Sequence, residues 1–216
     1  MLDLLSKVVE TVQLDKKERL SQFESKKRKM TEEDIEEFFE DVERIDKVPA
    51  YVMEITGVCL RTVPQVCSDN ILTNFVPLYA KQLENVANSK SYEINQALCF
   101  FCDCLEHGSP SLLSAILPQL PSKYFEVFAK QKSSQDRDEE ARDLVQTCIF
   151  GMGVLATKVQ GDAFPSGQVM EAIKWVYDME FKTEKGLRAE CCENATSTLA
   201  KCVYFHGAAL PADIVN

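Results

Sequence analysis

Residues 98–105 read LCFFCDCL, and this stretch decides the fold of the chain. At about 100° per residue in an α-helix, its side chains are apolar in nearly every direction, with Asp103 as the sole polar interruption. Such a helix needs cover on several sides, so we expect residues 95–108 to form a helix inside a layer of other helices. The thiols of Cys99 and Cys102 should then be buried.

Helical apolar spacing continues on both sides of this segment, and it repeats. An aliphatic residue recurs near the end of the first helix of each predicted pair. These residues are 45, 50 and 48 positions apart: Leu60, Leu105, Leu155 and Val203. Two-helix units of about 40 to 47 residues are the period of HEAT and armadillo arrays, whose neighbouring units share a core. We therefore predict an all-α fold, a right-handed α-α superhelix of about four stacked helix pairs.

The pattern predicts a single array over residues 1–216. A helical N-terminal region (1–43) precedes helix pairs at 44–88, 91–132 and 136–182 and an incomplete last pair at 185–216. The chain ends where a second helix should begin, so we expect an excised piece or a partial gene model with apolar surface exposed at both ends. The apolar side chains expected there are Leu2, Leu5, Ile214 and Val215.

Two prolines and one threonine predict helix boundaries in the first third of the chain. Thr31, followed by Asp34, resembles a helix start before the acidic run 31–43, which carries an apolar stripe of Ile35, Phe38, Phe39 and Val42. The next helix is expected to begin near Pro49, because the missing donor of proline is tolerated in a first turn. A further helix should follow residues 68–70, with Pro77 bending its early turns.

Composition limits the possible functions. The chain carries 34 acidic and 24 basic side chains, a net charge of -10, which argues against binding nucleic acid through phosphates and favours a basic partner. The basic run 26–29, KKRK, is either a nuclear localisation signal or a solvated, ion-paired face. No segment approaches a membrane span and the N-terminus lacks a signal-peptide layout, so we expect no membrane contact and a location in cytoplasm or nucleus.

Catalytic and metal sites are weakly indicated. Cys99, Cys102 and His107 could converge on one zinc ion, but buried structural thiols are the favoured interpretation, so we expect no metal and no cofactor. His206, like His107, precedes a glycine and is expected to interact with the last carbonyls of its own helix. The small residues around Gly151 should allow close helix packing, because no dinucleotide fingerprint surrounds them. We expect no enzymatic activity.

Five short sequence strings, taken in their order and spacing along the chain, resemble a known protein family. In order they are EEFFEDVERIDKV before VMEITGVCL, then FVPLY, CLEHGSP, FGMGVLA and ENATSTLAKCVYF, spread from about Lys17 to Val215. In these strings the chain resembles the C-terminal half of karyopherin-beta nuclear transport receptors of the importin-beta-3 type.

The resemblance implies a superhelical HEAT array that carries cargo through the nuclear pore and shuttles between cytoplasm and nucleus. It implies basic cargo proteins, nucleoporin repeats and the small GTPase Ran as partners, with the main Ran contact outside this chain. The alternative is a HEAT scaffold subunit of another complex, such as a phosphatase or a condensin-like assembly. No residue of the family can be carried over individually.

Second helices commonly line the concave side of a HEAT superhelix, as the family resemblance suggests, so we expect a partner surface on the helix at 167–181. Its core stripe is Val169, Ala172, Ile173 and Val176. Helical geometry then places Glu171, Trp175 and Asp178 away from the core. A tryptophan between two carboxylates suits a basic segment. The alternative is that Trp175 packs on the neighbouring repeat.

Overall fold

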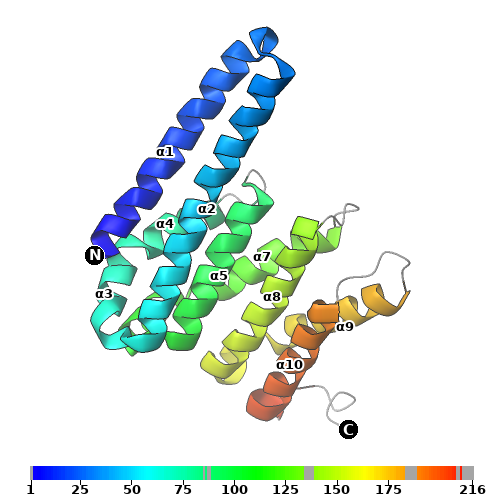
Figure 1. Ribbon diagram of the computed structural model, residues 1–216. Coiled ribbons are helices and arrows are strands. Elements are labelled where there is room, and N and C mark those ends of the chain that lie inside the picture. The colour runs from blue at the N-terminus through cyan, green and yellow to red at the C-terminus, as the bar shows by residue number, and fades with distance from the viewer. Residues whose placement is uncertain are drawn as a thin grey trace. The chain divides into compact units, whose positions relative to one another are not determined.

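The computed structural model describes residues 2–84, 86, 89–133, 139–182, 189–207 and 210. These residues form α-helices and short 3-10 helices, and no strand occurs among them. The prediction of an all-α fold is therefore confirmed. The helices belong to two compact units, Met1–Leu78 and Tyr79–Asn216 (Figure 1).

The first unit is a long antiparallel helical hairpin. Helix α1 (Leu2–Lys26) packs against α2 (Glu32–Thr62), and a 3-10 turn, η1 (Lys27–Lys29), joins them at the tip (Figure 1). Helix α3 (Pro64–Asn74) packs against both near the other end. The buried apolar side chains of the unit include Val9, Phe23, Val42, Val52, Leu60 and Ile71.

The predicted start at Thr31 is confirmed. The Thr31 hydroxyl accepts a hydrogen bond from the backbone N–H of Asp34, at 3.2 Å, and the Asp34 carboxylate accepts one from the backbone N–H of Thr31, at 2.9 Å. This reciprocal pair satisfies two of the donors that a helix start leaves unpaired.

The predicted helix start near Pro49 is wrong, because α2 is continuous and Pro49 lies inside it. Asp46, three residues before Pro49, is of a residue type that often caps the start of a helix. Its carboxylate instead forms an ion pair with the ammonium group of Lys16 in α1. An internal proline forfeits one backbone hydrogen bond. Pro49 is itself buried, and its packing offsets part of that cost.

The next boundary is also earlier than expected. Helix α3 begins at Pro64, not after residues 68–70, because a proline in the first helical position loses no hydrogen bond. The expected effect of Pro77 is confirmed, since the helical path breaks at Phe75 and restarts as α4 (Val76–Glu84).

The second unit contains the repeated helices. Helix α5 (Ser91–His107) packs against α8 (Glu139–Lys158), and α8 packs against α10 (Ala189–His206) (Figure 1). Helix α7 (Leu120–Ser133) packs on α8, and α9 (Ser166–Lys182) packs on α8 and α10. Two short elements, α6 (Pro110–Ile116) and η2 (Gly161–Ala163), lie in the connections.

Helix α5 is covered on several sides, as its sequence predicts. Six of its side chains between residues 98 and 105 are buried, namely Leu98, Phe100, Phe101, Cys102, Cys104 and Leu105. The ring of Phe100 stacks on Tyr79 with centroids 4.4 Å apart. Cys99 is half-buried, less than predicted, and its sulfur lies 3.8 Å from the hydroxyl oxygen of Thr147 in α8.

The expected close packing around Gly151 is confirmed. A Cβ atom at Gly151 would lie 2.2 Å from Cε1 of Tyr124 in α7, and one at Gly153 would lie 2.4 Å from Oγ1 of Thr198 in α10. The Tyr124 hydroxyl donates a hydrogen bond to the carbonyl of Leu98, at 3.0 Å. The missing side chains of α8 therefore let two neighbouring helices approach its backbone.

The ends of the chain agree in part with the expected exposure. Leu2 and Leu5 are half-buried, and Leu4 between them is 66% exposed. Ile214 and Val215 lie outside the described residues. The repeat positions Leu105 and Leu155 are fully buried, whereas Val203 is 39% exposed, because α10 turns the neighbouring Cys202 inward instead.

Candidate protein-binding surface

The inner face of α9 holds the helix in place. The predicted core stripe is confirmed, since the buried residues include Val169, Ala172, Ile173 and Val176. Their spacing of three and four residues gathers them on one side of the helix. Met170 is buried beside this stripe, whereas Glu171 and Lys174 are exposed on the other side, which decides what α9 offers to a partner.

The three predicted binding residues lie on this outward side, but they differ in exposure. Glu171 is exposed, whereas Trp175 and Asp178 are half-buried. The Trp175 ring meets Phe128 of α7 edge to face, with centroids 5.3 Å apart. The indole thus packs partly on the preceding helix pair, which is the alternative that the sequence left open. Lys174, also exposed, shares this side and offsets part of the negative charge.

An apolar groove of about 580 Å³ opens beside α9 within the second unit. One wall comes from the turn between α6 and α7, and the other from the connection between α8 and α9. The lining residues are Leu117, Pro118, Pro121, Ser122, Phe125, Val159, Ala163, Pro165 and Gln168. Apart from Ser122 and Gln168 these side chains are apolar, so the groove suits an apolar or aromatic side chain of a partner.

Prolines shape both walls of the groove. The second helix of the predicted pair at 91–132 is divided, because α6 ends at Ile116 and α7 begins at Leu120. Pro121 occupies the second position of α7, and Pro165 directly precedes α9, where the lack of an N–H is harmless. These prolines were the signal in the sequence for the groove, but their arrangement in space depends on how two repeats pack.

The groove and the predicted residues form one continuous surface. On α9, Gln168 lines the groove and lies seven residues, about two turns, before Trp175. On α7, Phe125 lines the groove and lies one turn before Phe128, the contact of Trp175. We call this combination the α7–α9 surface. It offers an apolar groove at one end and Glu171 with the tryptophan edge at the other.

The fully buried cysteines are poorly placed for reaction. Burial raises the pKa of the Cys102 thiol and of the Cys148 thiol far above the ordinary value. The sulfur of Cys102 lies 3.0 Å from the Tyr124 hydroxyl. In the adjacent pair on α10, Cys191 is buried and Cys192 is half-buried. Among the described residues, no three His, Cys, Asp or Glu side chains are grouped to hold a metal ion.

The prediction that a histidine interacts with the last carbonyls of its own helix is wrong for His206 and stays a prediction for His107. His206 is buried, its Nε2 lies 2.7 Å from the carbonyl oxygen of Ala156 in α8, and its ring stacks on Phe164 with centroids 4.1 Å apart. The imidazole thus joins α10 to its neighbours. His107 is half-exposed, and its Nε2 lies 3.7 Å from a carboxylate oxygen of Glu106.

The comparisons with known proteins return no relative. No protein-family model matches the chain, and no curated protein matches it significantly. Within the described part of the chain, no helix has the length and apolar character that a membrane span requires.

Proposed function

We propose that this chain is a protein-binding segment of a nuclear import receptor of the karyopherin-beta family. In this proposal the chain has a HEAT-type array, carries basic cargo through the nuclear pore in a Ran-dependent cycle, and shuttles between cytoplasm and nucleus. The family assignment rests on the five strings in register. The all-helical, repeat-like packing is compatible with it.

The observation that carries the binding function is the α7–α9 surface. An apolar side chain of the partner enters the groove between Pro121 and Pro165. A lysine or arginine that follows it reaches Glu171, while its aliphatic stem lies along the exposed part of the Trp175 ring. The partner expected from this chemistry is an extended cargo segment that combines an apolar residue with basic ones.

The test uses the single tryptophan of the chain as a probe at the site itself. A lysine-rich cargo peptide with one phenylalanine is titrated while tryptophan emission is recorded at low and at physiological salt. We expect a saturable change in emission, with an affinity that falls as salt rises. Glu171→Lys should weaken binding about fivefold to tenfold, the effect of one partly exposed charge pair.

The matched control is Glu193→Lys, which changes the net charge equally at an exposed position of α10. It should leave the affinity within about twofold of the original protein. If both variants weaken the peptide equally, or if tryptophan emission does not change at saturation, the α7–α9 surface is not the binding site. The family is tested separately, since the native full-length protein should recover nucleoporin repeats and GTP-loaded Ran from solution.

A further inference from the structure

A second surface lies on the first unit, on the side of α2 that faces away from α1. Three large apolar side chains are exposed there: Tyr51 by 59%, Ile55 by 41% and Val58 by 49%. Their spacing of four and three residues places them within about 60° of one another around the helix. The opposite side of the same turns is buried through Val52, Thr56 and Leu60, so α2 has apolar side chains on both faces at this end.

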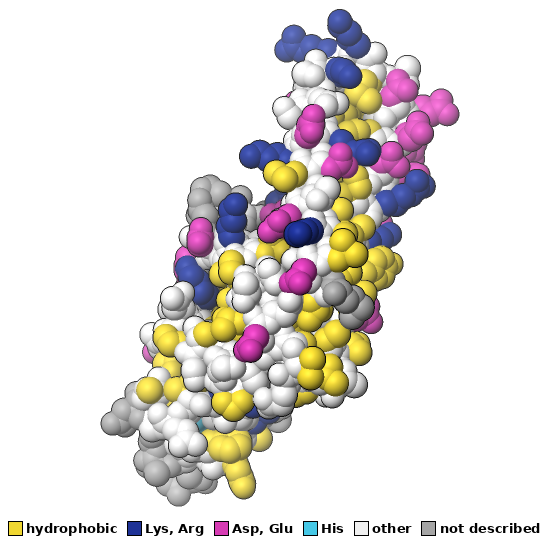
Figure 2. Space-filling model, turned by 90° about the vertical axis from the view of Figure 1, so that its left-hand side faces the viewer, with side chains coloured by type: hydrophobic (Ala, Val, Ile, Leu, Met, Phe, Trp, Pro, Cys, Tyr) yellow, Lys and Arg dark blue, Asp and Glu magenta, His cyan; other side chains and the backbone are white. Residues whose placement is uncertain are grey.

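The other end of the same face is acidic. At about 100° per residue, Glu33, Glu36, Glu37 and Glu40 point within about 60° of the direction of Tyr51. All four carboxylates are exposed. Figure 2 shows acidic side chains gathered along the upper part of the hairpin, below the basic tip at 26–29. The same geometry places the exposed Arg44 and Lys47 between the two ends of this face and the exposed Glu54 at its apolar end. We define the outer face of α2 as the set Glu33, Glu36, Glu37, Glu40, Arg44, Lys47, Tyr51, Glu54, Ile55 and Val58.

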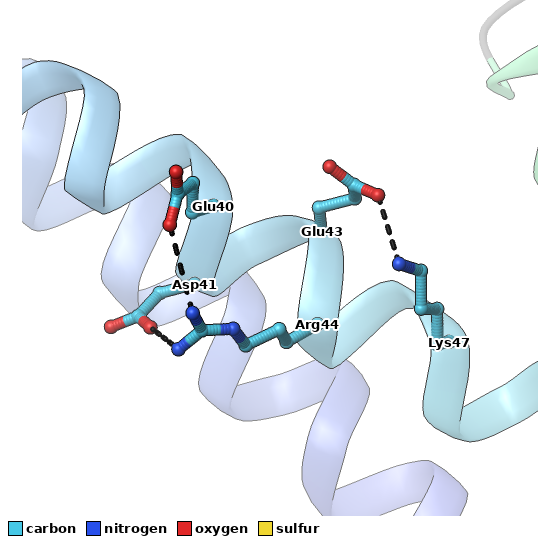
Figure 3. A network of polar contacts seen from close by, with 5 residues as sticks. All are labelled: Glu40, Asp41, Glu43, Arg44 and Lys47. Carbon is cyan, nitrogen blue, oxygen red and sulfur yellow. Dashed lines mark hydrogen bonds and ion pairs between the residues drawn. The ribbon is translucent and has the colours of Figure 1, made fainter.

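Ion pairs within α2 lie between the acidic end and the apolar end of this face. Arg44 pairs with Glu40, at 3.6 Å, and with Asp41, at 3.3 Å, while Lys47 pairs with Glu43, at 2.9 Å (Figure 3). Two cations therefore offset much of the charge of the three carboxylates in the middle of the helix. Across the described residues, no ion pair is recorded for Glu33, Glu36 or Glu37, so their charge is available to a partner.

We propose that the outer face of α2 is the docking surface for an amphipathic helix of another protein, basic at its C-terminal end and apolar at its N-terminal end. Charge complementarity requires the basic end of the partner to lie beside the start of α2, and the helix dipole of the partner sets its direction. An antiparallel helix also places its lysines in its own last turns, where the helix dipole favours positive charge. The acidic and apolar centres are about 18 residues apart, so the two ends of the partner must be separated by about 27 Å.

Other occupants fit this face less well. An anionic membrane would be repelled by the four glutamates. In an antiparallel pair of identical α2 faces, the acidic half of one copy would cover the apolar half of the other and desolvate carboxylates without cations. This inference involves residues of the first unit and is independent of the α7–α9 surface.

The probes are two labelled helical peptides of about 28 residues with identical composition. The first has leucines toward its N-terminus and lysines toward its C-terminus, and in the second the two ends are exchanged. Anisotropy titrations use the whole chain at two salt concentrations. We expect the first peptide to bind about twofold to fivefold more tightly than the second, because the second can place its lysines beside Glu36 only by lying parallel to α2, with those lysines in its own first turns.

Paired variants assign the contacts. Glu33→Lys with Glu37→Lys should weaken the first peptide at least about tenfold and flatten the salt dependence. Tyr51→Ser with Val58→Ser should weaken it similarly but leave the salt dependence unchanged. The controls are the same substitutions on exposed positions of α1, at Glu10, Glu24 and Leu14, and they should change the affinity less than about twofold. Helical circular dichroism checks that each variant is folded.

Several results would overturn the proposal. Equal affinity for the two peptides would show that the face does not read polarity. If the α1 variants weaken peptide binding as much as the α2 variants do, net charge alone governs binding. Concentration-dependent dimerisation in sedimentation equilibrium that disappears in the Tyr51→Ser variant would identify a second copy as the occupant instead. Binding of the chain to anionic vesicles through this face would identify a lipid surface.

Discussion

Replacing Gly151 by alanine tests the packing at the centre of the second unit. The added Cβ would lie 2.2 Å from Cε1 of Tyr124, and an ordinary contact between carbon atoms is about 3.5 Å. The ring must therefore retreat by about 1.3 Å, although it is fully buried. Its hydroxyl would leave the Leu98 carbonyl and the Cys102 sulfur, both now at 3.0 Å.

The magnitude follows from these terms. Overpacking of this kind costs about 1 to 3 kcal/mol, and loss of a buried hydrogen bond adds about 1 kcal/mol. Alanine returns about 1 kcal/mol in helix propensity, so Gly151→Ala should lower the free energy of unfolding by about 2 kcal/mol. The corresponding fall in melting temperature is about 4 to 8 °C. Thermal and urea unfolding followed by helical circular dichroism measure both quantities.

Two controls separate this clash from a general effect of alanine. Gly167→Ala adds a Cβ that meets no atom within 4 Å, so it should be neutral or stabilise α9 by up to about 1 kcal/mol. In a Tyr124→Val background the clashing ring is absent, so Gly151→Ala should lose most of its cost. The packing argument is refuted if Gly151→Ala stabilises the protein as Gly167→Ala does, or if its cost is unchanged without the ring.

Further predictions concern the cap, the thiols and the buried imidazole. Thr31→Ala should fray the start of α2 and lower stability by about 1 kcal/mol in urea unfolding. The hydrogen bonds from Thr31 lower the pKa of Asp34, so its contribution is present above its ordinary value of 3.8 and is lost as pH falls through the lower folded value; an acid titration of α2 helicity checks this. Cys192, half-buried, should react with an alkylating reagent in the native protein while Cys102 stays protected, as mass spectrometry of the peptides would show. His206→Ala removes the hydrogen bond with the carbonyl of Ala156 and the stacking on Phe164. It should lower the free energy of unfolding by about 2 kcal/mol, measured in thermal melts.

The helical faces could be predicted from the sequence because each depends on spacing along one helix. The stripe from Val169 to Val176 and the nearly all-apolar helix around Phe100 are examples, and both are buried as expected. The cap at Thr31 was predictable for the same reason, since its partner is three residues away.

What depends on contacts between helices was not predictable. Pro49 looked like a helix start, but whether a proline is tolerated inside α2 depends on what packs around it and on Lys16, thirty residues earlier, pairing with Asp46. The exposure of Trp175 depends on Phe128, which lies in the preceding helix pair. The apolar groove arises where two connections come together in space, so no single segment carries its signal.

The fit of the Tyr124 ring against Gly151 also limits how the second unit can move. The Tyr124 ring occupies the space where α8 has no side chain. It therefore restricts sliding of α7 along α8, because the ring would have to pass over the neighbouring side chains of α8. Thr198 holds α10 at Gly153 in the same way. Any accommodation of a bound segment is therefore expected to come from pivoting about these two points.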